Sequence, residues 1–215
     1  MNILTQILIQ APVILFSVII HEYAHGWMAE KRGDDTARIM GRLTLNPIPH
    51  IDLFGTIILP AICIMSHMPV FGWAKPVPVN PNRLNDPKRD MVWVSLAGPL
   101  SNFTLAVAAA FIMWGVRTFP VLPPGLSMTI YELMQFMLVI NVILPVFNLI
   151  PVPPLDGSKV VMGMLPYELA YRYASMERYG FIIIVLLMST NILWKILGPV
   201  VSFIVASLGG GTNYF

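Results

Sequence analysis

Long stretches without a charged side chain dominate this sequence and limit what it can fold into. They extend over residues 1–20, 53–74, 91–116 and 133–155, and only Lys195 separates residues 179–194 from residues 196–215. Several of these stretches reach the roughly 20 residues that a helix needs to cross about 30 Å of hydrocarbon. Only 11% of the residues are charged, whereas soluble domains contain about 25%. The sequence therefore predicts an integral membrane protein.

The remaining composition restricts the partners and the chemistry. A net charge of +2 without a dense basic cluster argues against a nucleic acid partner. Because Cys63 is the one cysteine, an intramolecular disulfide and a thiolate metal cluster are both excluded, so any metal must be held by nitrogen and oxygen. The N-terminal run lacks a basic n-region and is interpreted as a retained first span, not a signal peptide. We expect residues 1–215 to form a single domain.

Two histidines and a glutamate follow directly on the first apolar run, in the sequence His21-Glu22-Tyr23-Ala24-His25. Residues four apart on a helix lie on nearly the same face, so both imidazoles can reach one metal ion with Glu22 beside them. This is the H-E-x-x-H pattern, in which two neutral imidazoles bind zinc and the glutamate acts as a base. Ionisable residues in a spanning helix are costly, which favours a functional site over a pair of interfacial histidines.

A hydrolytic zinc site also needs a third protein ligand and an open position for water. Asp156 is the favoured candidate, because it follows a long uncharged run and a segment, residues 151–154, whose three prolines forbid a regular helix. Non-helical backbone near membrane depth is tolerated where it lines a protein cavity. His50 and Asp52 form the competing pair of ligands, although a polar turn is the simpler interpretation of both.

Three motifs together resemble the site-2 protease family of intramembrane zinc metalloproteases. They are His21-Glu22-Tyr23-Ala24-His25 with Gly26 after it, Gly98-Pro99-Leu100-Ser101-Asn102, and Asn148 through Pro151, Pro153 and Pro154 to Leu155-Asp156-Gly157. The likeness covers roughly residues 10–165. It implies a catalytic core in a compact form without a PDZ or CBS domain, for which the chain has no room.

The resemblance also implies roles for individual residues. His21, His25 and Asp156 would bind one zinc ion, and Glu22 would be the catalytic base. Asn102 and Asn148 would lie beside the active site and bind the substrate. Beyond this core, we expect residues from about 159 to 208 to form an amphipathic helix and a last span.

The topology can be predicted without the family. Three apolar segments, at about 52–68, 91–117 and 128–150, separate His25 from Asp156, and the two residues can meet only after an even number of crossings. The first segment is the shortest, so we expect it to be re-entrant. The preceding residues 38–46 alternate in a strand-like way and predict a short β-hairpin near the active site, whose unpaired edge could receive an unwound substrate. The predicted fold class is therefore an all-α integral membrane protein with about four full transmembrane helices, a re-entrant segment and this hairpin.

Basic residues support the same topology. With a re-entrant segment, one face carries almost all the loop basic residues, and the other has only Arg117 at the edge of its loop. The residues on the first face are Lys31, Arg32, Arg38, Arg42, Lys75, Arg83, Lys88 and Arg89. The positive-inside rule makes this face cytoplasmic. We therefore expect a multi-pass protein of a bacterial-type cell membrane, with the active site opening towards the cytoplasm.

These observations predict a zinc-dependent intramembrane endopeptidase that acts in regulated intramembrane proteolysis. Its partners would be a transmembrane protein substrate and the lipid bilayer. Glu22 would accept a proton from the attacking water and pass it to the leaving amine. Two alternatives remain open: a metal-ion or proton transporter that uses the same His, Glu and Asp cluster, and a structural membrane scaffold. The sequence does not indicate an oligomeric state.

Overall fold

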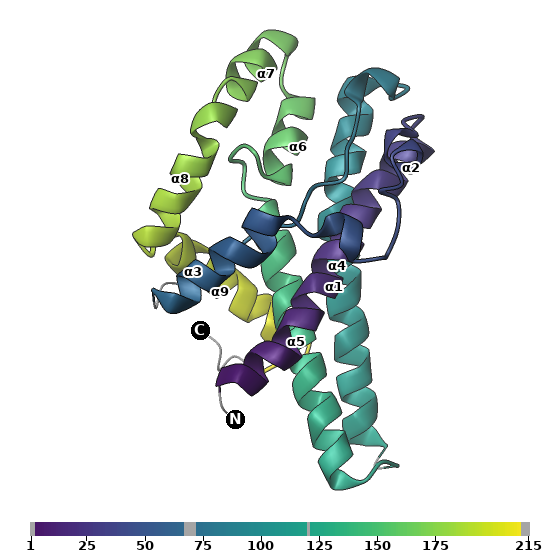
Figure 1. The fold of residues 1–215 in the computed structure, drawn as a ribbon, viewed down its shortest axis with the longest axis vertical. Helices are drawn as coiled ribbons and strands as arrows, with labels where there is room; N and C mark the ends of the chain where they lie inside the picture. Colours follow the sequence, from purple (N-terminus) through teal and green to yellow (C-terminus); the bar gives the residue numbers. More distant parts are fainter. Residues whose placement is uncertain (1–2, 67–71, 120, 212–215) are drawn as a thin grey trace.

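The chain forms a bundle of helices (Figure 1), and the computed structural model describes residues 3–66, 72–119 and 121–211. The α-helices are α1 (Ile3–Lys31), α2 (Thr36–Ile39), α3 (Leu59–Met65), α4 (Pro87–Thr118), α5 (Pro124–Asn148), α6 (Asp156–Met164), α7 (Tyr167–Ala174), α8 (Glu177–Ser189) and α9 (Ile192–Ser207). Short 3₁₀ turns are η1 (Ile48–His50) and η3 (Pro81–Arg83), and a π-helical segment, η2 (Leu53–Ile58), leads directly into α3. The predicted all-helical character is confirmed for the described residues.

Among the residues that the structure describes, two helices, α4 and α5, are long and apolar enough to cross a membrane. Pro87 begins α4 in a position where its missing N–H is harmless, and the Asp86 side chain caps the helix by accepting from the Arg89 N–H at 3.1 Å. The pair α8 and α9 is also apolar enough, but the two helices are bent by 77°, as in a broken span or a re-entrant loop. The bend lies at Asn191, which adopts a left-handed φ of 57°. The predicted total of about four crossings stays a prediction.

Helix α4 is the centre of the bundle. It packs against α1, α5 and α6, and α9 packs against α5, with Val201 and Val205 of α9 in the same buried cluster as residues of α4 and α5. Ala106 and Ala109 of α4 are buried against Leu138 and Val142 of α5. Small side chains let two helix backbones approach closely, which is the usual way to obtain tight packing between apolar helices. Through these contacts α4 holds α1 and α6, which carry the predicted metal ligands, in one place.

The predicted β-hairpin is not found, because the described residues contain no β-strand. Helix α2 occupies the start of the segment 38–46, and Gly41 then adopts a positive φ of 64°. The N–H groups of Arg42 and Leu43 both return to the carbonyl of Ala37, at 2.8 and 3.2 Å. These local turn hydrogen bonds satisfy the backbone without a strand partner, so the alternation of side chains is misleading here.

Residues on either side of the apolar segment that the sequence predicts as re-entrant are in contact with each other. The Trp73 N–H donates to the Gly55 carbonyl at 3.1 Å, and Thr56 Oγ1 donates to the Trp73 carbonyl at 2.9 Å. A side chain at Gly55 would not fit, because its Cβ would lie 2.3 Å from Trp73 Nε1. This pattern of contacts is the one expected of a segment that enters and leaves by one face.

The connections before and after this segment also lie side by side. The Asn80 N–H donates to Asp34 Oδ2 at 2.6 Å, and the Asn85 N–H donates to the Arg32 carbonyl at 2.9 Å. The end of α1 and the start of α4 therefore meet at one end of the bundle. The connection between α4 and α5 lies at the other end of these helices (Figure 1).

Single cysteines test this arrangement, on a Cys63→Ala background that removes the native thiol. We expect Lys31→Cys and Asn82→Cys to react with a membrane-impermeant maleimide from the same side of sealed vesicles. Val121→Cys, whose position is 83% exposed, should react from the opposite side. Labelling of positions 31 and 82 from opposite sides would mean that residues 53–73 cross the membrane.

Candidate active site

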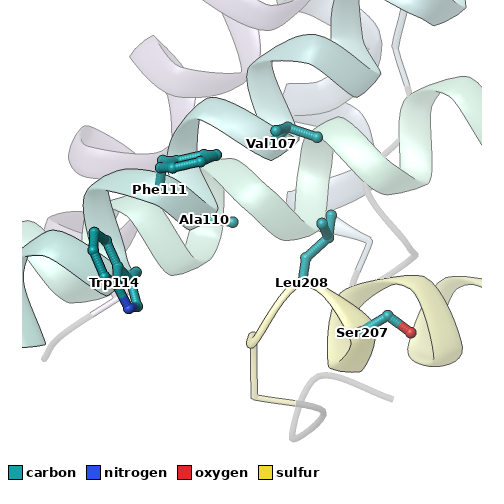
Figure 2. A pocket seen from close by; sticks show the side chains of 6 residues that line it. All are labelled: Val107, Ala110, Phe111, Trp114, Ser207 and Leu208. Carbon is teal, nitrogen blue, oxygen red and sulfur yellow. The ribbon is translucent and has the colours of Figure 1, made fainter.

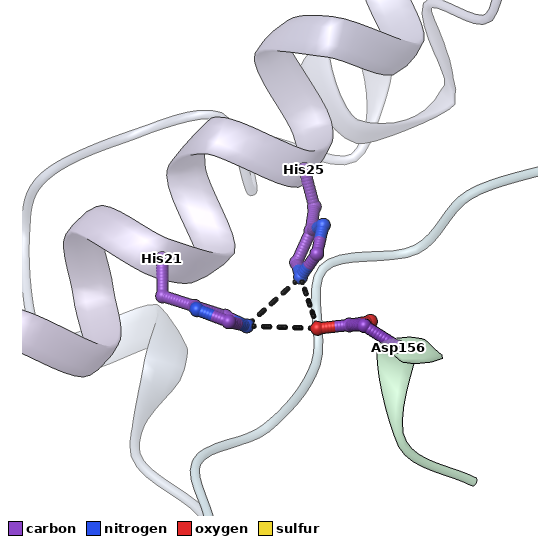
Figure 3. A group of neighbouring side chains, drawn as sticks. All are labelled: His21, His25 and Asp156. Atoms are coloured by element: carbon purple, nitrogen blue, oxygen red, sulfur yellow. Dashed lines mark hydrogen bonds and ion pairs between the residues drawn. The ribbon is translucent and has the colours of Figure 1, made fainter. Parts of the chain in front are cut away.

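Three ionisable side chains from distant parts of the chain meet at one point inside the bundle. His21 Nε2 lies 3.1 Å and His25 Nε2 lies 3.2 Å from Asp156 Oδ2, and the two Nε2 atoms are 2.9 Å apart (Figure 3). All three side chains are buried. The ligands of a tetrahedral zinc ion, at about 2.0–2.1 Å from the metal, lie roughly 3.3 Å from one another. The donor types and their spacing therefore fit a zinc ion.

The second nitrogen of each imidazole determines which tautomer is present. His25 Nδ1 lies 2.7 Å from the Val94 carbonyl oxygen, which can only accept, so this Nδ1 carries the proton. His21 Nδ1 lies 2.6 Å from Asn102 Oδ1 and likewise donates. Both Nε2 atoms of the neutral rings therefore present lone pairs to each other and to a carboxylate. Such a buried group of acceptors requires a cation or a shared proton, and this is how imidazole ligands are prepared for a metal.

A buried polar network sets the orientation of Asn102. Its Nδ2 donates to the Ser17 carbonyl at 3.0 Å and to Asn141 Oδ1 at 2.8 Å, and Asn141 Nδ2 donates to Ser17 Oγ at 2.8 Å. All three residues are fully buried, at 0% exposure. Because the Asn102 nitrogen already has two acceptors, its oxygen must face His21. The tautomer of His21 thus follows from the packing of α1, α4 and α5.

Gly98 lets α4 lie directly against the two imidazoles. A Cβ atom at this position would lie 2.4 Å from His25 Nε2 and 2.7 Å from His21 Cε1, well inside contact distance. Any side chain at residue 98 would therefore occupy the space where the ligands converge. This close approach gives a physical reason for the glycine in the Gly98–Asn102 motif.

Asp156 reaches the cluster because the chain turns back after α5. Prolines prevent residues 149–155 from continuing the helix, and α6 begins at Asp156 itself, where the helix dipole favours a carboxylate. The turn depends on Gly157, whose Cβ would lie 2.2 Å from the Leu149 carbonyl oxygen. The second oxygen of Asp156, Oδ1, lies 3.4 Å from Lys159 Nζ.

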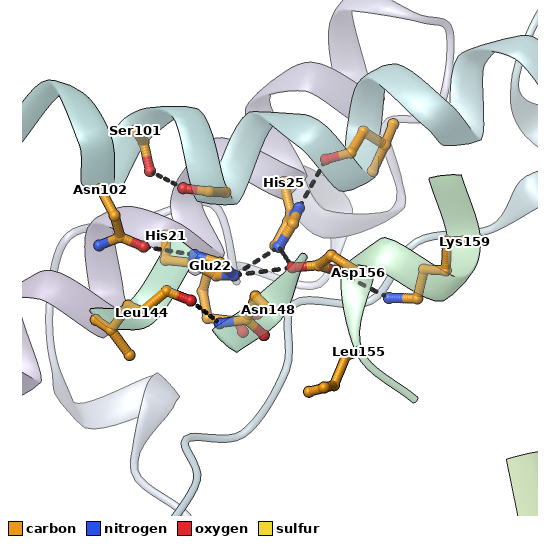
Figure 4. Close-up of polar contacts among 12 residues, drawn as sticks. His21, Glu22, His25, Ser101, Asn102, Leu144, Asn148, Leu155, Asp156 and Lys159 are labelled. Carbon is orange, nitrogen blue, oxygen red and sulfur yellow. Dashed lines mark hydrogen bonds and ion pairs between the residues drawn. The ribbon is translucent and has the colours of Figure 1, made fainter. Parts of the chain in front are cut away.

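Glu22 follows the first histidine on α1 and is held by a segment from elsewhere in the chain. The Val77 N–H donates to Glu22 Oε2 at 2.7 Å. Figure 4 shows Glu22 beside His21, together with Asn102, Asn148 and the residues around Asp156. A carboxylate next to a metal cluster and oriented by a backbone N–H is suited to accept a proton from water.

The remaining predicted residues form hydrogen bonds with groups close to them in the sequence. Asn148, at the end of α5, donates to the Leu144 carbonyl of its own helix at 2.9 Å. His50 is buried, with Nε2 at 2.8 Å from the Thr44 carbonyl, and Asp52 accepts from the Gly55 N–H at 2.6 Å. The competing pair, His50 and Asp52, therefore serves local turns and lies outside the metal cluster.

Sequence reasoning missed Ser17, Asn141 and Val77. Ser17 and Asn141 had a usable signal, because a polar side chain inside an apolar run often forms a hydrogen bond between helices. Val77 had none, since its contribution is a backbone N–H in a connection 55 residues from Glu22.

A cavity of about 380 Å³ lies between α4 and the end of α9, away from this cluster (Figure 2). Its lining residues are Val107, Ala110, Phe111, Trp114, Ser207 and Leu208. No ionisable side chain is among them, and Phe111 and Trp114 are more than half exposed. In a membrane protein such an apolar outer surface faces lipid, so this cavity offers no catalytic chemistry.

The fold and the cluster define a helical membrane protein with a buried His-His-Asp centre suited to a metal ion. Residues 10–129 and 123–189 match peptidase family M50. The chain therefore belongs to peptidase family M50, a family of metalloproteases, and the resemblance to site-2 proteases found in the sequence is confirmed.

Two relatives have names that agree with this family. The Bacillus subtilis protein YwhC, named a zinc metalloprotease, is 37% identical over 193 residues, which are 86% of this chain and 83% of that protein. The Mycolicibacterium smegmatis protein Rip2, also named a zinc metalloprotease, is 29% identical over 177 residues, which are 82% of this chain and 64% of that protein. No solved structure matches the chain significantly. The family supports a protease and does not favour the transporter alternative.

The close approach of Gly98 leads to a prediction about metal binding. Gly98→Ala should abolish stoichiometric zinc binding in the purified protein, measured by mass spectrometry of the metal, because the new methyl group displaces both imidazoles. Gly115→Ala is the matched control on the same helix, since a Cβ there meets nothing within 4 Å. Full zinc occupancy in Gly98→Ala would show that the ligands do not converge as described.

A second prediction concerns the tautomer of His21. Asn102→Leu keeps a similar volume but removes the acceptor for Nδ1–H, and we expect zinc affinity to fall about 10- to 100-fold. Competition with a chromophoric chelator measures this change. An unchanged affinity would separate Asn102 from the metal site.

Proposed function

We propose that this protein is a zinc-dependent endopeptidase that hydrolyses peptide bonds within or near a transmembrane segment of another membrane protein. The observation that carries the proposal is the convergence of His21 Nε2, His25 Nε2 and Asp156 Oδ2, all acceptors, on one buried point. Family membership makes proteolysis the chemistry to which such a centre belongs. The position of the cluster among apolar helices supports a substrate that is itself embedded in the bilayer.

His21, His25 and Asp156 would hold the zinc ion and leave a further coordination position open for water. When bound, zinc supplies a Lewis acid that acidifies water and polarises a peptide carbonyl. Glu22 takes the proton from the attacking water onto its carboxylate and then gives it to the leaving amine. The Nδ1–H bonds of both imidazoles to Asn102 and Val94 keep the rings in the tautomer that binds metal through Nε2.

Asn102 and Asn148 have different parts in this proposal. Asn102 is completely buried and its amide is fully used by His21, Ser17 and Asn141. We therefore propose that Asn102 positions His21 and does not bind the substrate. Asn148 is half-buried at the end of α5. Its amide is available to bind a substrate backbone once it leaves the Leu144 carbonyl.

The substrate must lose its helical structure before it is cut. Carbonyls in an uninterrupted membrane helix are used by the helix's own hydrogen bonds, so a scissile bond becomes accessible only where the helix unwinds. We expect glycine, proline or polar residues near the cleavage position. Basic residues at the shared end of α1 and α4 favour a cytoplasmic opening for the site, in a cell membrane of bacterial type.

Glu22→Gln tests the assignment of the base. The variant should retain stoichiometric zinc, because Glu22 is not a ligand, and should lose about 10²- to 10⁴-fold in the rate of substrate cleavage. The control is Glu30→Gln on the same helix, because the Glu30 side chain pairs with Arg38 at the surface. Cleavage of a reconstituted transmembrane substrate is measured by gel together with zinc content. Wild-type cleavage by Glu22→Gln would refute the assignment.

A further inference from the structure

Residues 73–80, which we name the strap, cross α1 directly over Glu22. The Val77 side chain is buried, at 7% exposure, and the Val77 N–H donates to Glu22 Oε2 at 2.7 Å. The strap can lie this close only because the next turn of α1 contains Gly26, where a Cβ would lie 2.8 Å from Val77 Cγ1. The contact with Glu22 thus depends on the close packing of Val77 against Gly26.

Buried charged groups fix the strap on both sides of Val77. On one side, Arg42 Nη2 donates to the carbonyls of Lys75 and Pro76 at 2.8 and 3.2 Å. On the other, Asp34 Oδ2 accepts from the Asn80 N–H at 2.6 Å. Arg42 is 8% exposed and Asp34 is 0% exposed. Charges are costly to bury unless they are hydrogen-bonded. Because Arg42 and Asp34 form these hydrogen bonds with backbone groups of the strap, they hold the strap in one position.

The sequence of the strap makes it stiff and limits its hydrogen bonding. Val77 lies between Pro76 and Pro78, which fix their own φ angles and keep the preceding residues extended. Neither proline has an N–H, so Pro76 and Pro78 can only accept backbone hydrogen bonds. The Val77 N–H is the one donor among these three residues, and it is given to Glu22.

We propose that the strap is a positioning element for the general base. It holds Glu22 through Oε2, so that Oε1 is the oxygen that accepts the proton from water, and Arg42 and Asp34 act as positioning residues through the strap. A glutamate side chain that is free to rotate would rarely meet the water in the right geometry, and displacement of a catalytic group by about 1 Å can cost about 10²-fold in rate. This inference rests on the proposed function and specifies how its base is oriented.

Val77→Pro removes the N–H and keeps an extended backbone. We expect kcat for cleavage of a reconstituted transmembrane substrate to fall about 10²-fold, with KM, bound zinc and melting temperature unchanged. Val77→Ala removes the side chain but keeps the N–H, and should remain at least about tenfold more active than Val77→Pro. Equal activity in these two variants, or loss of zinc in Val77→Pro, would overturn the proposal.

Gly26→Ala tests the same contact without altering the strap backbone. Its methyl group should push Val77 away from Glu22 and lower kcat with zinc retained, and the double variant Gly26→Ala/Val77→Ala should recover activity because Cγ1 is gone. A wild-type kcat in Gly26→Ala, whose new Cβ would lie 2.8 Å from Val77 Cγ1, contradicts the role of the strap even if Val77→Pro does not fold. Failure of the proposed function is distinguishable, since wild-type protein loaded with zinc would then cleave nothing.

Discussion

The contact among two imidazole nitrogens and one carboxylate is the constraint on which the rest of the structure depends. Three acceptor atoms within 3.2 Å of one another would repel in a buried place unless a cation or a shared proton lay between them. These atoms come together only because α1, α4 and α6 converge. Each of the three helices makes a different contribution. Helix α1 supplies the spacing of four residues, α4 supplies Gly98 and the acceptors for Nδ1, and α6 begins at the carboxylate.

Much of the site could be predicted from local sequence, because its chemistry is encoded in short motifs. His21, Glu22 and His25 share one helix, and Asp156 is conspicuous as an acid after a long apolar run. The structure brings the two histidines and Asp156 together. Helices were also predictable, since long apolar runs satisfy their backbone hydrogen bonds most simply within one helix. The hydrogen bond from Trp73 to Gly55 agrees with the re-entrant segment expected from counting crossings, which stays a prediction.

The remaining features depend on contacts between residues distant in sequence. The predicted β-hairpin is wrong because alternation of side chains cannot reveal that the N–H groups of Arg42 and Leu43 turn back to Ala37. The same Arg42 appears in the sequence as an ordinary basic loop residue, yet it is buried on the strap. The link between Asn141 and Ser17 spans 124 residues. Periodicity and motif spacing carry no information about such pairs, which are decided by how whole helices pack.

Two proline-rich segments without helical structure lie beside the His-His-Asp cluster, and proline has the same effect on the backbone of both. The strap approaches Glu22 with Pro76 and Pro78, and the connection to Asp156 contains Pro151, Pro153 and Pro154. Non-helical backbone among apolar helices is unfavourable because each unpaired N–H loses its water. A proline contributes no N–H, so a proline-rich segment can stay extended with fewer unsatisfied groups and little flexibility. A peptide bond can be hydrolysed only in an unwound chain, and these segments supply non-helical surroundings at modest cost. The prolines and the His-His-Asp cluster therefore have related parts in the structure: the cluster could hold a metal ion, and the prolines allow irregular backbone to stand beside it.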